Sequence, residues 1–535
     1  MATDAQLLIR DARIVDGSGS PWYTGHVLID DGTITELRRG DGEKMTGDIV
    51  VDADSRIVCP GFIDVHSHSD LELFEDGTLA PKIRQGITTE ILGQDGFSMA
   101  PVTGREAQQA WQDTIADLAG RTDHGWTWDS VSEYLAAVEE HGIAPNVGTL
   151  VGHGTVRFEV MGMSDRTPAA DEVEAMADLV TAGLEQGAVG FSTGLVYPPQ
   201  YNADTAEVAA LASRLHPYGR PFVAHIRSEG RWLWEALDEF IDIGAEYEIP
   251  LHLSHFKVAG KQQQGKSDRA LHRLDAARER GVDITADQYP YAAGSSPLSA
   301  LLPPWVHTDG PSGVLERLHD SELRERIKVD IERWRIEGWE NYGAQAGWDN
   351  VVIAHVESDA NEHLQGMSVA AIASERGVHP VDVVCDLLVE EELEVTSIEH
   401  GMAEEDVERI MADRRAAVAT DGLFGGQPHP RTYGTYPRIL GTYVRERNHL
   451  ELEEAIRKMT SLPARAMGLS SKGLLRPEMD ADIVVFDPSL VDARSTFDSS
   501  TRFPVGIDHV LVNGEPVVTD GEVTGNRPGA VIRAQ

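Results

Sequence analysis

The stretch GFIDVHSHSD at residues 61–70 is the most informative part of the sequence for the fold, because a short apolar run there ends in two histidines separated by one serine. Such a run, preceded by glycine and rich in branched apolar residues, is typical of a buried strand. Similar runs alternate with stretches of helical periodicity, and they lie at 86–93, 144–152, 188–194, 221–227, 250–256, 282–291, 351–356 and 416–422. This alternation over about 400 residues predicts an α/β fold of the (β/α)8, TIM-like barrel type.

The two ends of the chain differ from its middle. Residues 1–60 and 470–535 contain short runs of alternating apolar and polar residues, punctuated by Asp-Gly pairs, which is typical of strands joined by tight turns. We therefore expect both ends to form one small β-sandwich domain beside a barrel over 61–469. Residues 297–350 break the barrel alternation, and we expect an insertion there that covers the site.

The charge balance excludes some partners. The chain has 535 residues, with 46 Lys and Arg against 88 Asp and Glu, and its formal net charge is −42. This excess argues against electrostatic binding of nucleic acid or of an anionic membrane. Only eight of the basic residues are lysines. An acid-rich, lysine-poor composition predicts a halophilic protein, hydrated and soluble in concentrated salt; an ordinary acidic cytosolic protein is the alternative.

Cysteine content and hydropathy indicate the compartment. Two cysteines, Cys59 and Cys385, exclude a disulfide framework and a metal site made of cysteine alone. Residues 1–17 lack the basic and apolar parts of a signal peptide, and no uninterrupted apolar stretch of about 18 residues follows. We expect a cytoplasmic protein without a membrane partner, and the oligomeric state stays open.

Four histidines close predicted strands. His66 and His68 are two residues apart, so both imidazoles point to the same side of a strand. His225 and His255 each close a later run. One such histidine is more often a core or surface residue, but four at the same end of a barrel predict a site for a borderline cation such as Zn²⁺.

Asp421 ends the last predicted strand, in AAVATDG. A carboxylate at this place can orient a metal-bound water and accept its proton. The Asp-Gly pair also fits a plain turn. The four histidines expected nearby favour the catalytic interpretation.

This order of residues resembles the amidohydrolase superfamily, in which an HxH pair, two single histidines and a final-strand aspartate form the site. Further motifs are similar to the N-acyl-D-amino-acid deacylase (D-aminoacylase) family and run in order over essentially the whole chain: GFSTGLVYPP, AHIRSEG, LSHFK, DQYPYAAGSS, HPRTYGTYPR, MTSLPARAMGL and ADIVVFDP. The resemblance implies that Lys257 and Arg431 hold the carboxylate of the substrate. It also implies that Tyr289, Ser295 and Tyr197 contact the substrate, and Glu229 is expected to support its loop or His225.

Asp95 marks a departure from the family pattern. The family commonly has a metal-binding cysteine in a Gly-Asn-Cys-Gly sequence, whereas this chain reads ILGQDGFSMAP at 91–101. We expect Asp95 to ligate or bridge metal through a carboxylate, which is a harder ligand than a thiolate; a plain turn is the alternative. No lysine lies between Lys82 and Lys257 to take the place of the carboxylated lysine of wider relatives.

The resemblance implies metal-dependent hydrolysis of the amide bond of an N-acyl-D-amino acid, with one or two divalent ions, zinc first. The substrate would be a small acylated amino acid, and the products a carboxylate and a free D-amino acid. Two alternatives stay open. One is a dipeptidase or a cyclic-amide hydrolase of the hydantoinase kind, and the other is a metal- or ligand-binding barrel without activity.

Overall fold

The computed structural model describes residues 4–40, 45–120, 122 and 125–534. Its centre is a barrel of eight parallel strands, in which β8 continues into β9 after a one-residue break. The strands are β6 (Phe62–Asp64), β7 (Ile87–Leu92), β8 (Asn146–Thr149) with β9 (Val151–Gly152), β10 (Phe191–Gly194), β11 (Phe222–His225), β12 (Leu251–Leu253), β13 (Ile284–Gln288) and β17 (Ala416–Val418). A parallel bridge between Ser67 and Gly422 closes the ring between β6 and β17. This confirms the predicted (β/α)8 barrel.

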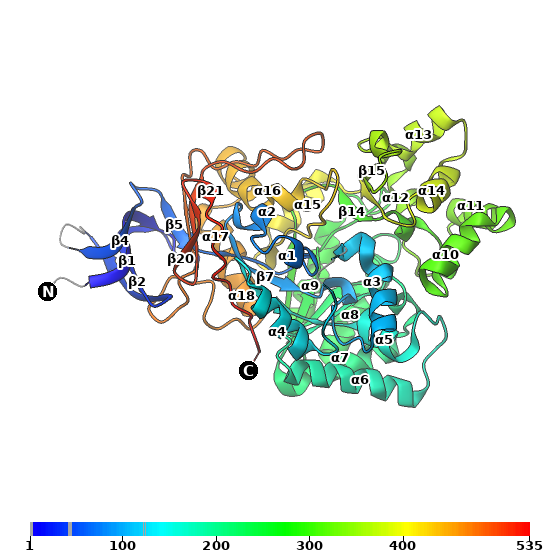
Figure 1. Ribbon diagram of the computed structural model, residues 1–535, viewed down its shortest axis with the longest axis horizontal. Coiled ribbons are helices and arrows are strands. Elements are labelled where there is room, and N and C mark those ends of the chain that lie inside the picture. The colour runs from blue at the N-terminus through cyan, green and yellow to red at the C-terminus, as the bar shows by residue number, and fades with distance from the viewer. Residues whose placement is uncertain (1–3, 41–44, 121, 123–124, 535) are drawn as a thin grey trace.

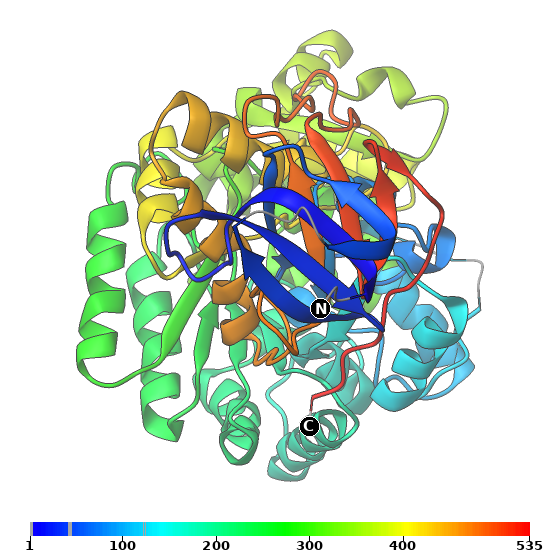
Figure 2. The same cartoon turned by 90° about the vertical axis from the view of Figure 1, so that its left-hand side faces the viewer.

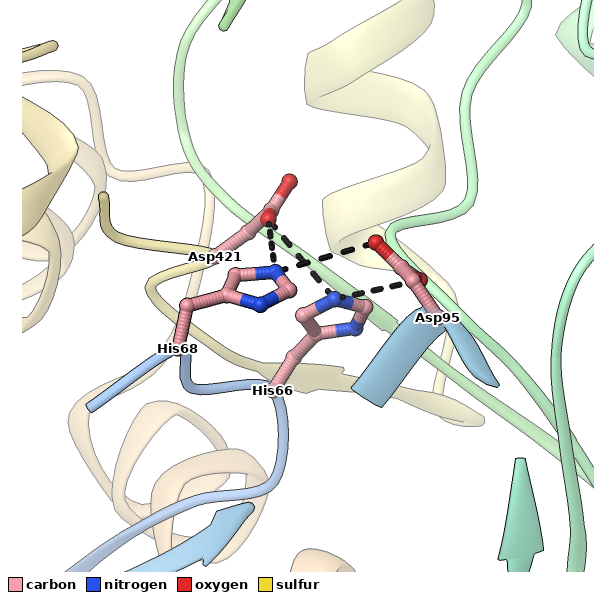
Figure 3. Close-up of side chains that lie close together, drawn as sticks. All are labelled: His66, His68, Asp95 and Asp421. Carbon is pink, nitrogen blue, oxygen red and sulfur yellow. Dashed lines mark ion pairs between the residues drawn. The ribbon is translucent and has the colours of Figure 1, made fainter. Parts of the chain in front are cut away.

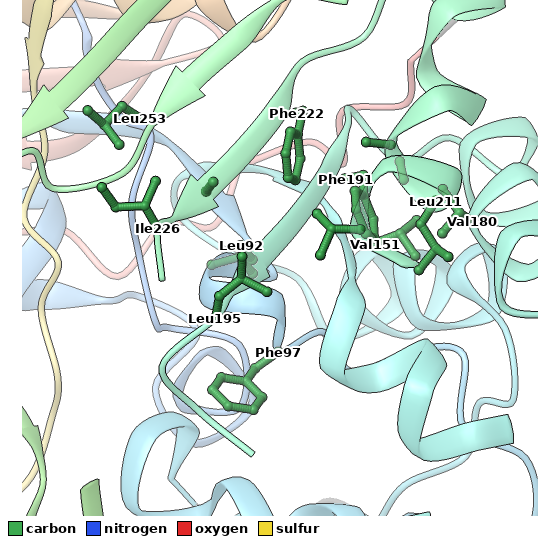
Figure 4. Close-up of a cluster of buried hydrophobic side chains, with 14 of the residues drawn as sticks. Leu92, Phe97, Val151, Val180, Phe191, Leu195, Leu211, Phe222, Ile226 and Leu253 are labelled. Carbon is green, nitrogen blue, oxygen red and sulfur yellow. The ribbon is translucent and has the colours of Figure 1, made fainter. Parts of the chain in front are cut away.

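Helices surround these strands and bury one face against them. In α8 (Leu233–Tyr247) the buried residues Leu233, Ala236, Leu237, Phe240 and Ile241 recur at helical spacing, as expected for a helix that covers a sheet. Side chains from strands and helices form a continuous apolar core (Figure 4). The other helices are α1 (Glu72–Glu75), α2 (Ala80–Ile83), α3 (Arg105–Ala119), α4 (Val131–His141), α5 (His153–Met161), α6 (Ala170–Glu185), α7 (Thr205–Ala212), α9 (Ser267–Glu279), α15 (Glu404–Ala412), α16 (Arg431–Arg438), α17 (Leu452–Met459) and α18 (Ser461–Ala466).

Both ends of the chain contribute strands to one nine-stranded network. The link is β5 (Ile57–Pro60), which pairs antiparallel with β18 (Ile483–Phe486). The remaining strands are β1 (Asp4–Ile14), β2 (Tyr23–Asp30), β3 (Thr33–Arg39), β4 (Thr46–Asp52), β19 (Ile507–Val512), β20 (Glu515–Thr519) and β21 (Glu522–Val523). Figure 2 shows these strands in front of the barrel. The terminal β-domain predicted from the sequence is therefore present.

A separate segment interrupts the barrel between β13 and β17. It contains β14 (Gly294–Pro297), α10 (Gly310–His319), α11 (Ser321–Arg333), α12 (Tyr342–Ala346), β15 (Val351–Val356), α13 (Val369–Arg376), α14 (Pro380–Glu390) and β16 (Val395–Glu399). Its three strands form their own sheet in the order β14-β16-β15. In Figure 1 its helices lie at the end of the molecule opposite the terminal strands.

The apolar run at 351–356 is β15 of this sheet, so its prediction as a barrel strand is wrong. β15 pairs antiparallel with β16, whereas every described pairing within the barrel is parallel. The apolar pattern predicts a buried strand but does not say which sheet the strand joins. The range 297–350, predicted as an insertion, falls inside the longer segment 294–399.

No helix in the described part of the chain has both the length and the apolar character needed to cross a membrane.

Candidate metal centre and active site

The candidate site lies at the carboxyl ends of the barrel strands, where TIM-barrel enzymes place their functional groups. The chain brings six side chains there from five strands: His66 and His68 follow β6, Asp95 follows β7, His225 ends β11, His255 follows β12 and Asp421 follows β17. All six are buried. The structure thus brings together the metal-ligand and base residues predicted from the sequence.

Tight turns of the backbone set the direction of several of these side chains. Asp95, His255 and Asp421 have positive φ angles of 53°, 32° and 49°, a region in which Asp and His are more common than most residues. A Cβ on Gly194, at the end of β10, would lie 2.4 Å from the carbonyl oxygen of Asp95. Only glycine allows this close approach, which fixes the Asp95 turn against β10. The Asp-Gly turns at 95 and 421 therefore belong to the site.

Asp95 is shared by two groups of possible metal ligands. Its Oδ1 lies 3.5 Å from Nε2 of His66, and its Oδ2 lies 3.7 Å from Nε2 of His68. Asp421 Oδ1 completes this first group, at 3.6 Å from His66 Nε2 and 3.3 Å from His68 Nε2. Figure 3 shows the two imidazoles between the two carboxylates.

The second group consists of Asp95, His225 and His255. Asp95 Oδ1 lies 3.5 Å from Nε2 of His255 and 3.9 Å from Nδ1 of His225. Within each group, one ligand atom from each residue lies within 4.8 Å of the others. Two cation-sized positions with one common carboxylate follow from this geometry.

The donor atoms fit a divalent metal. Both ring nitrogens of His66 and of His225, Nε2 of His68 and Oδ1 of Asp95 are buried and have no hydrogen-bond partner, which is costly unless something else binds them. Burial would raise the pKa of Asp95, but His66 and His255 hold it well below its usual value. Imidazole nitrogens together with carboxylate oxygens are a donor set that zinc accepts.

Two carboxylates support the histidines from behind. Glu229 Oε1 lies 2.9 Å from Nδ1 of His255, and its Oε2 lies 3.7 Å from Nε2 of His225. Asp287, on β13, accepts the backbone N–H of His255 at 2.8 Å, and its Oδ2 lies 3.6 Å from Nδ1 of His66. Such contacts fix the orientation of a ligating imidazole. Asp287 was not predicted as a site residue, although it lies on β13 two residues before Tyr289.

The two predicted carboxylate-binding cations already have protein partners. Lys257 Nζ lies 2.8 Å and 2.9 Å from the two oxygens of Glu229. Arg431, at the start of α16, pairs through Nη1 with Asp421 Oδ2 at 2.9 Å and donates from Nη2 to the carbonyl of Ser295 at 3.2 Å. Burial would raise the pKa of Glu229, but Lys257 and the neighbouring histidines lower it to about 2.

A pocket opens above the candidate ligands. The five residues predicted to bind substrate all line it, namely Lys257, Arg431, Tyr289, Ser295 and Tyr197. The guanidinium carbon of Arg431 lies 4.5 Å from the centre of the Tyr289 ring. Tyr342, Gln345 and Ala346 of the inserted segment also line the pocket, so this segment contributes to its wall.

A buried lysine that was not predicted as a site residue lies behind the site. Lys82 on α2 donates from Nζ to Asp64 at 2.9 Å, to Ser67 at 2.8 Å and to Thr420 at 2.9 Å. Its Nζ also lies 3.5 Å from Glu90 on β7. Ser67 separates the two histidines and Thr420 precedes Asp421, so one ammonium group joins the ends of β6 and β17.

Comparison with known proteins agrees with this geometry. The amidohydrolase family model matches residues 49–518. The chain is 35% identical over 536 residues to N-acyl-D-glutamate deacylase from Alcaligenes xylosoxydans xylosoxydans, covering 100% of this chain and 97% of the relative. It is 32% identical over 527 residues to D-aminoacylase from the same organism, covering 98% and 97%.

A solved structure is similar over the same length. It is N-acyl-D-glutamate deacylase from Bordetella bronchiseptica with zinc and a phosphonate inhibitor that mimics the tetrahedral intermediate. It has a TM-score of 0.84 and 33% identity, and the match covers 99% of this chain and 100% of that chain. The chain therefore belongs to the amidohydrolase family and, within it, to the D-aminoacylase family that its motifs resemble.

Proposed function

We propose that this protein is a metal-dependent hydrolase that cleaves the amide bond of N-acyl-D-amino acids, giving a carboxylate and a free D-amino acid. One observation carries the proposal: two groups of buried, unpartnered ligand atoms share Asp95, and Asp421 faces one of them. The relatives named above, all deacylases of D-amino acids, support the same reaction.

His66, His68 and Asp95 would hold one divalent ion, with Asp421 beside it as the base, and Asp95, His225 and His255 would hold a second, with zinc the first candidate. When bound, such an ion polarises the scissile carbonyl and lowers the pKa of a water molecule toward neutrality. Asp95 would contribute to both positions. The N and O donors present here supply the ligands without any thiolate.

Asp421 is proposed as the group that moves the proton. Burial would raise its pKa, but Arg431 and His66 hold it well below its usual value, so the carboxylate is ionised at neutral pH. The ion pair with Arg431 fixes Oδ2 and leaves Oδ1 directed toward His66 and His68. Oδ1 can accept the proton of the attacking water, and the resulting strong acid can pass it to the leaving nitrogen.

Arg431, Tyr289 and Lys257 are proposed to hold the α-carboxylate of the substrate, with Ser295 and Tyr197 beside them. Nε of Arg431 and the hydroxyl of Tyr289 are buried donors without a partner. Lys257 Nζ lies 5.7 Å from the centre of the Tyr289 ring. A cationic wall with free donors suits one carboxylate.

The setting proposed is a cytoplasmic enzyme with a small-molecule substrate. The two cysteines are buried and unpaired, which supports a reducing compartment. The net charge of −42 supports a substrate other than nucleic acid.

A substrate panel tests the reaction. We expect hydrolysis of N-acetyl-D-methionine and little of its L enantiomer, of a dipeptide or of a hydantoin. Asp421→Asn should reduce kcat at least about a hundredfold, the contribution typical of a positioned acid or base, and should leave metal bound. Asp349→Asn, at an exposed position of the inserted segment, is the matched control. Turnover of hydantoins alone, or full activity of Asp421→Asn, would refute the proposal.

A further inference from the structure

The pocket contains a carboxylate that the proposed reaction does not use. Glu399 ends β16 of the inserted segment, is 7% exposed and lines the same pocket as the candidate ligands. Its Oε1 accepts hydrogen bonds from the hydroxyls of Ser296, at 3.1 Å, and Ser397. Within the described part of the chain, Glu399 has no ion pair with Lys, Arg or His at 4.0 Å or less.

The second oxygen of Glu399 faces an open corner of the pocket. A Cβ built on Gly294 would lie 3.9 Å from Glu399 Oε2 and 3.5 Å from the hydroxyl of Tyr289, with no other contact within 4 Å. That hydroxyl is buried and has no hydrogen-bond partner. The corner at Gly294 is therefore bounded by a carboxylate oxygen of Glu399 and by the unpartnered hydroxyl of Tyr289.

The charges of the pocket suit only one carboxylate of a ligand. Lys257 and Arg431 are the cationic side chains among the lining residues, and each is paired with a carboxylate of the protein. The rest of the wall includes the apolar side chains of Leu118, Ala346 and Met402. Once these two cations hold the α-carboxylate, a second carboxylate on the substrate would have no further Lys or Arg in the pocket wall, whereas Glu399 offers it a like charge.

We propose that Glu399 determines specificity, making the pocket selective for N-acyl-D-amino acids with a single carboxylate and disfavouring acidic side chains. This inference rests on the proposed function. Sequence identity does not lead to it, because the N-acyl-D-glutamate deacylase is slightly more similar to this chain than the D-aminoacylase is. A repulsive group aimed at the unwanted ligand is a common source of specificity.

The isosteric pair N-acetyl-D-glutamine and N-acetyl-D-glutamate tests it, because the two differ by one charge at nearly constant shape. We expect wild-type kcat/KM to favour the glutamine compound at least about tenfold, since like charges in contact are costly. The assay contains 1 M KCl, where screening reduces the repulsion of a distant acidic surface to a range of about 3 Å.

Glu399→Gln keeps the size of the side chain and removes its charge. We expect this variant to reduce the preference in kcat/KM for N-acetyl-D-glutamine over N-acetyl-D-glutamate at least about fivefold, mainly through a lower KM for N-acetyl-D-glutamate. Glu391→Gln is the matched control: Glu391 is a buried glutamate of the same segment that accepts hydrogen bonds from Ser358 and does not line the pocket. An unchanged ratio in Glu399→Gln, or an equal change in Glu391→Gln, would contradict the proposal.

The pH dependence of the ratio gives a second readout that a purely structural role would not change. Burial raises the pKa of Glu399 to about 7, although Ser397, Ser296 and Arg431 lower it in part. Repulsion between Glu399 and the side-chain carboxylate of N-acetyl-D-glutamate should therefore strengthen between pH 6 and pH 8. The preference in kcat/KM for N-acetyl-D-glutamine should rise over the same range. The tyrosines that interact with Glu399 or border the same corner have pKa values raised above this range by burial: Tyr197, Tyr289 and Tyr342. Groups that act equally on both substrates change both kcat/KM values by the same factor, so their titration does not alter the ratio of the two values.

The outcomes separate the two proposals. If N-acetyl-D-methionine is not hydrolysed, the proposed function fails. If it is hydrolysed and wild type accepts N-acetyl-D-glutamate as well as N-acetyl-D-glutamine, only the role of Glu399 fails. If Glu399→Gln does not fold, the wild-type ratio and its pH dependence decide.

Discussion

Asp95 combines two properties at one position. Its left-handed backbone, with φ of 53°, turns the chain directly after β7, and its two oxygens face histidines from three other strands, β6, β11 and β12. A thiolate at this place would offer one soft atom, whereas a carboxylate offers two hard ones. Aspartate in place of the cysteine that is common in the family would therefore favour a bridge between two metal positions. It would also extend the choice of metal toward harder ions.

Asp95→Ala should reduce the metal content of the purified protein from as many as two ions per chain to one at most. The variant removes the ligand common to both groups and leaves His225 and His255 alone at the second position. Metal analysis by mass spectrometry after exhaustive dialysis measures this directly. Asp349→Ala, at an exposed position, controls for handling. A metal content equal to wild type would show that Asp95 only shapes its turn.

At the scale of elements, the closure of the barrel depends on side chains as well as on backbone pairing. In the described residues, β6 and β17 are joined by the bridge between Ser67 and Gly422 and by a hydrogen bond from the Asp421 N–H to the carbonyl of His66. Lys82 adds a buried ammonium group that binds Asp64, Ser67 and Thr420 around this seam. Lys82 therefore helps to position the chain segments that carry His66, His68 and Asp421, the proposed ligands and base.

Lys82→Met should destabilise the protein by about 3–5 kcal/mol, the cost typical of removing one partner from a buried ion pair. It leaves Asp64 and Glu90 as buried carboxylates without a cation. Urea unfolding followed by tryptophan fluorescence gives the change. Lys328→Met is the control: its lysine pairs with Glu325 and Asp382 near the surface, where about 1 kcal/mol or less is expected. Equal losses in the two variants would show that the Lys82 network has no special role.

The sequence predicts elements better than it predicts their partners. The runs ending in His66, His225 and Asp421 identify barrel strands, because a buried parallel strand leaves a continuous apolar signal. The run at 351–356 carries the same signal and lies in another sheet. Lys82 and Glu399 were not predicted as site residues, because their roles arise from contacts between residues far apart in the chain, which one sequence does not reveal.

In the whole molecule, the pocket lies between the barrel and the inserted segment, because residues of both line it. The terminal strands and the inserted segment lie at opposite ends of the molecule (Figure 1). The inserted segment has its own apolar cluster of buried residues, so it can support residues such as Glu399 independently of the barrel strands.

The acidic surface should make the stability of the fold depend on salt. Helix α6 has exposed acids at Asp171, Glu174, Asp178 and Glu185 and no lysine or arginine in its length. With a net charge of −42, repulsion among such carboxylates opposes the folded state at low ionic strength. Raising KCl from 0.05 M to 2 M shortens the screening length from more than about 10 Å to about 3 Å or less, so the melting temperature should rise. Scanning calorimetry measures the rise, and sucrose at equal osmolality controls for effects of water activity. A melting temperature that falls with KCl, or rises equally in sucrose, would show that carboxylate repulsion does not limit the stability of this fold.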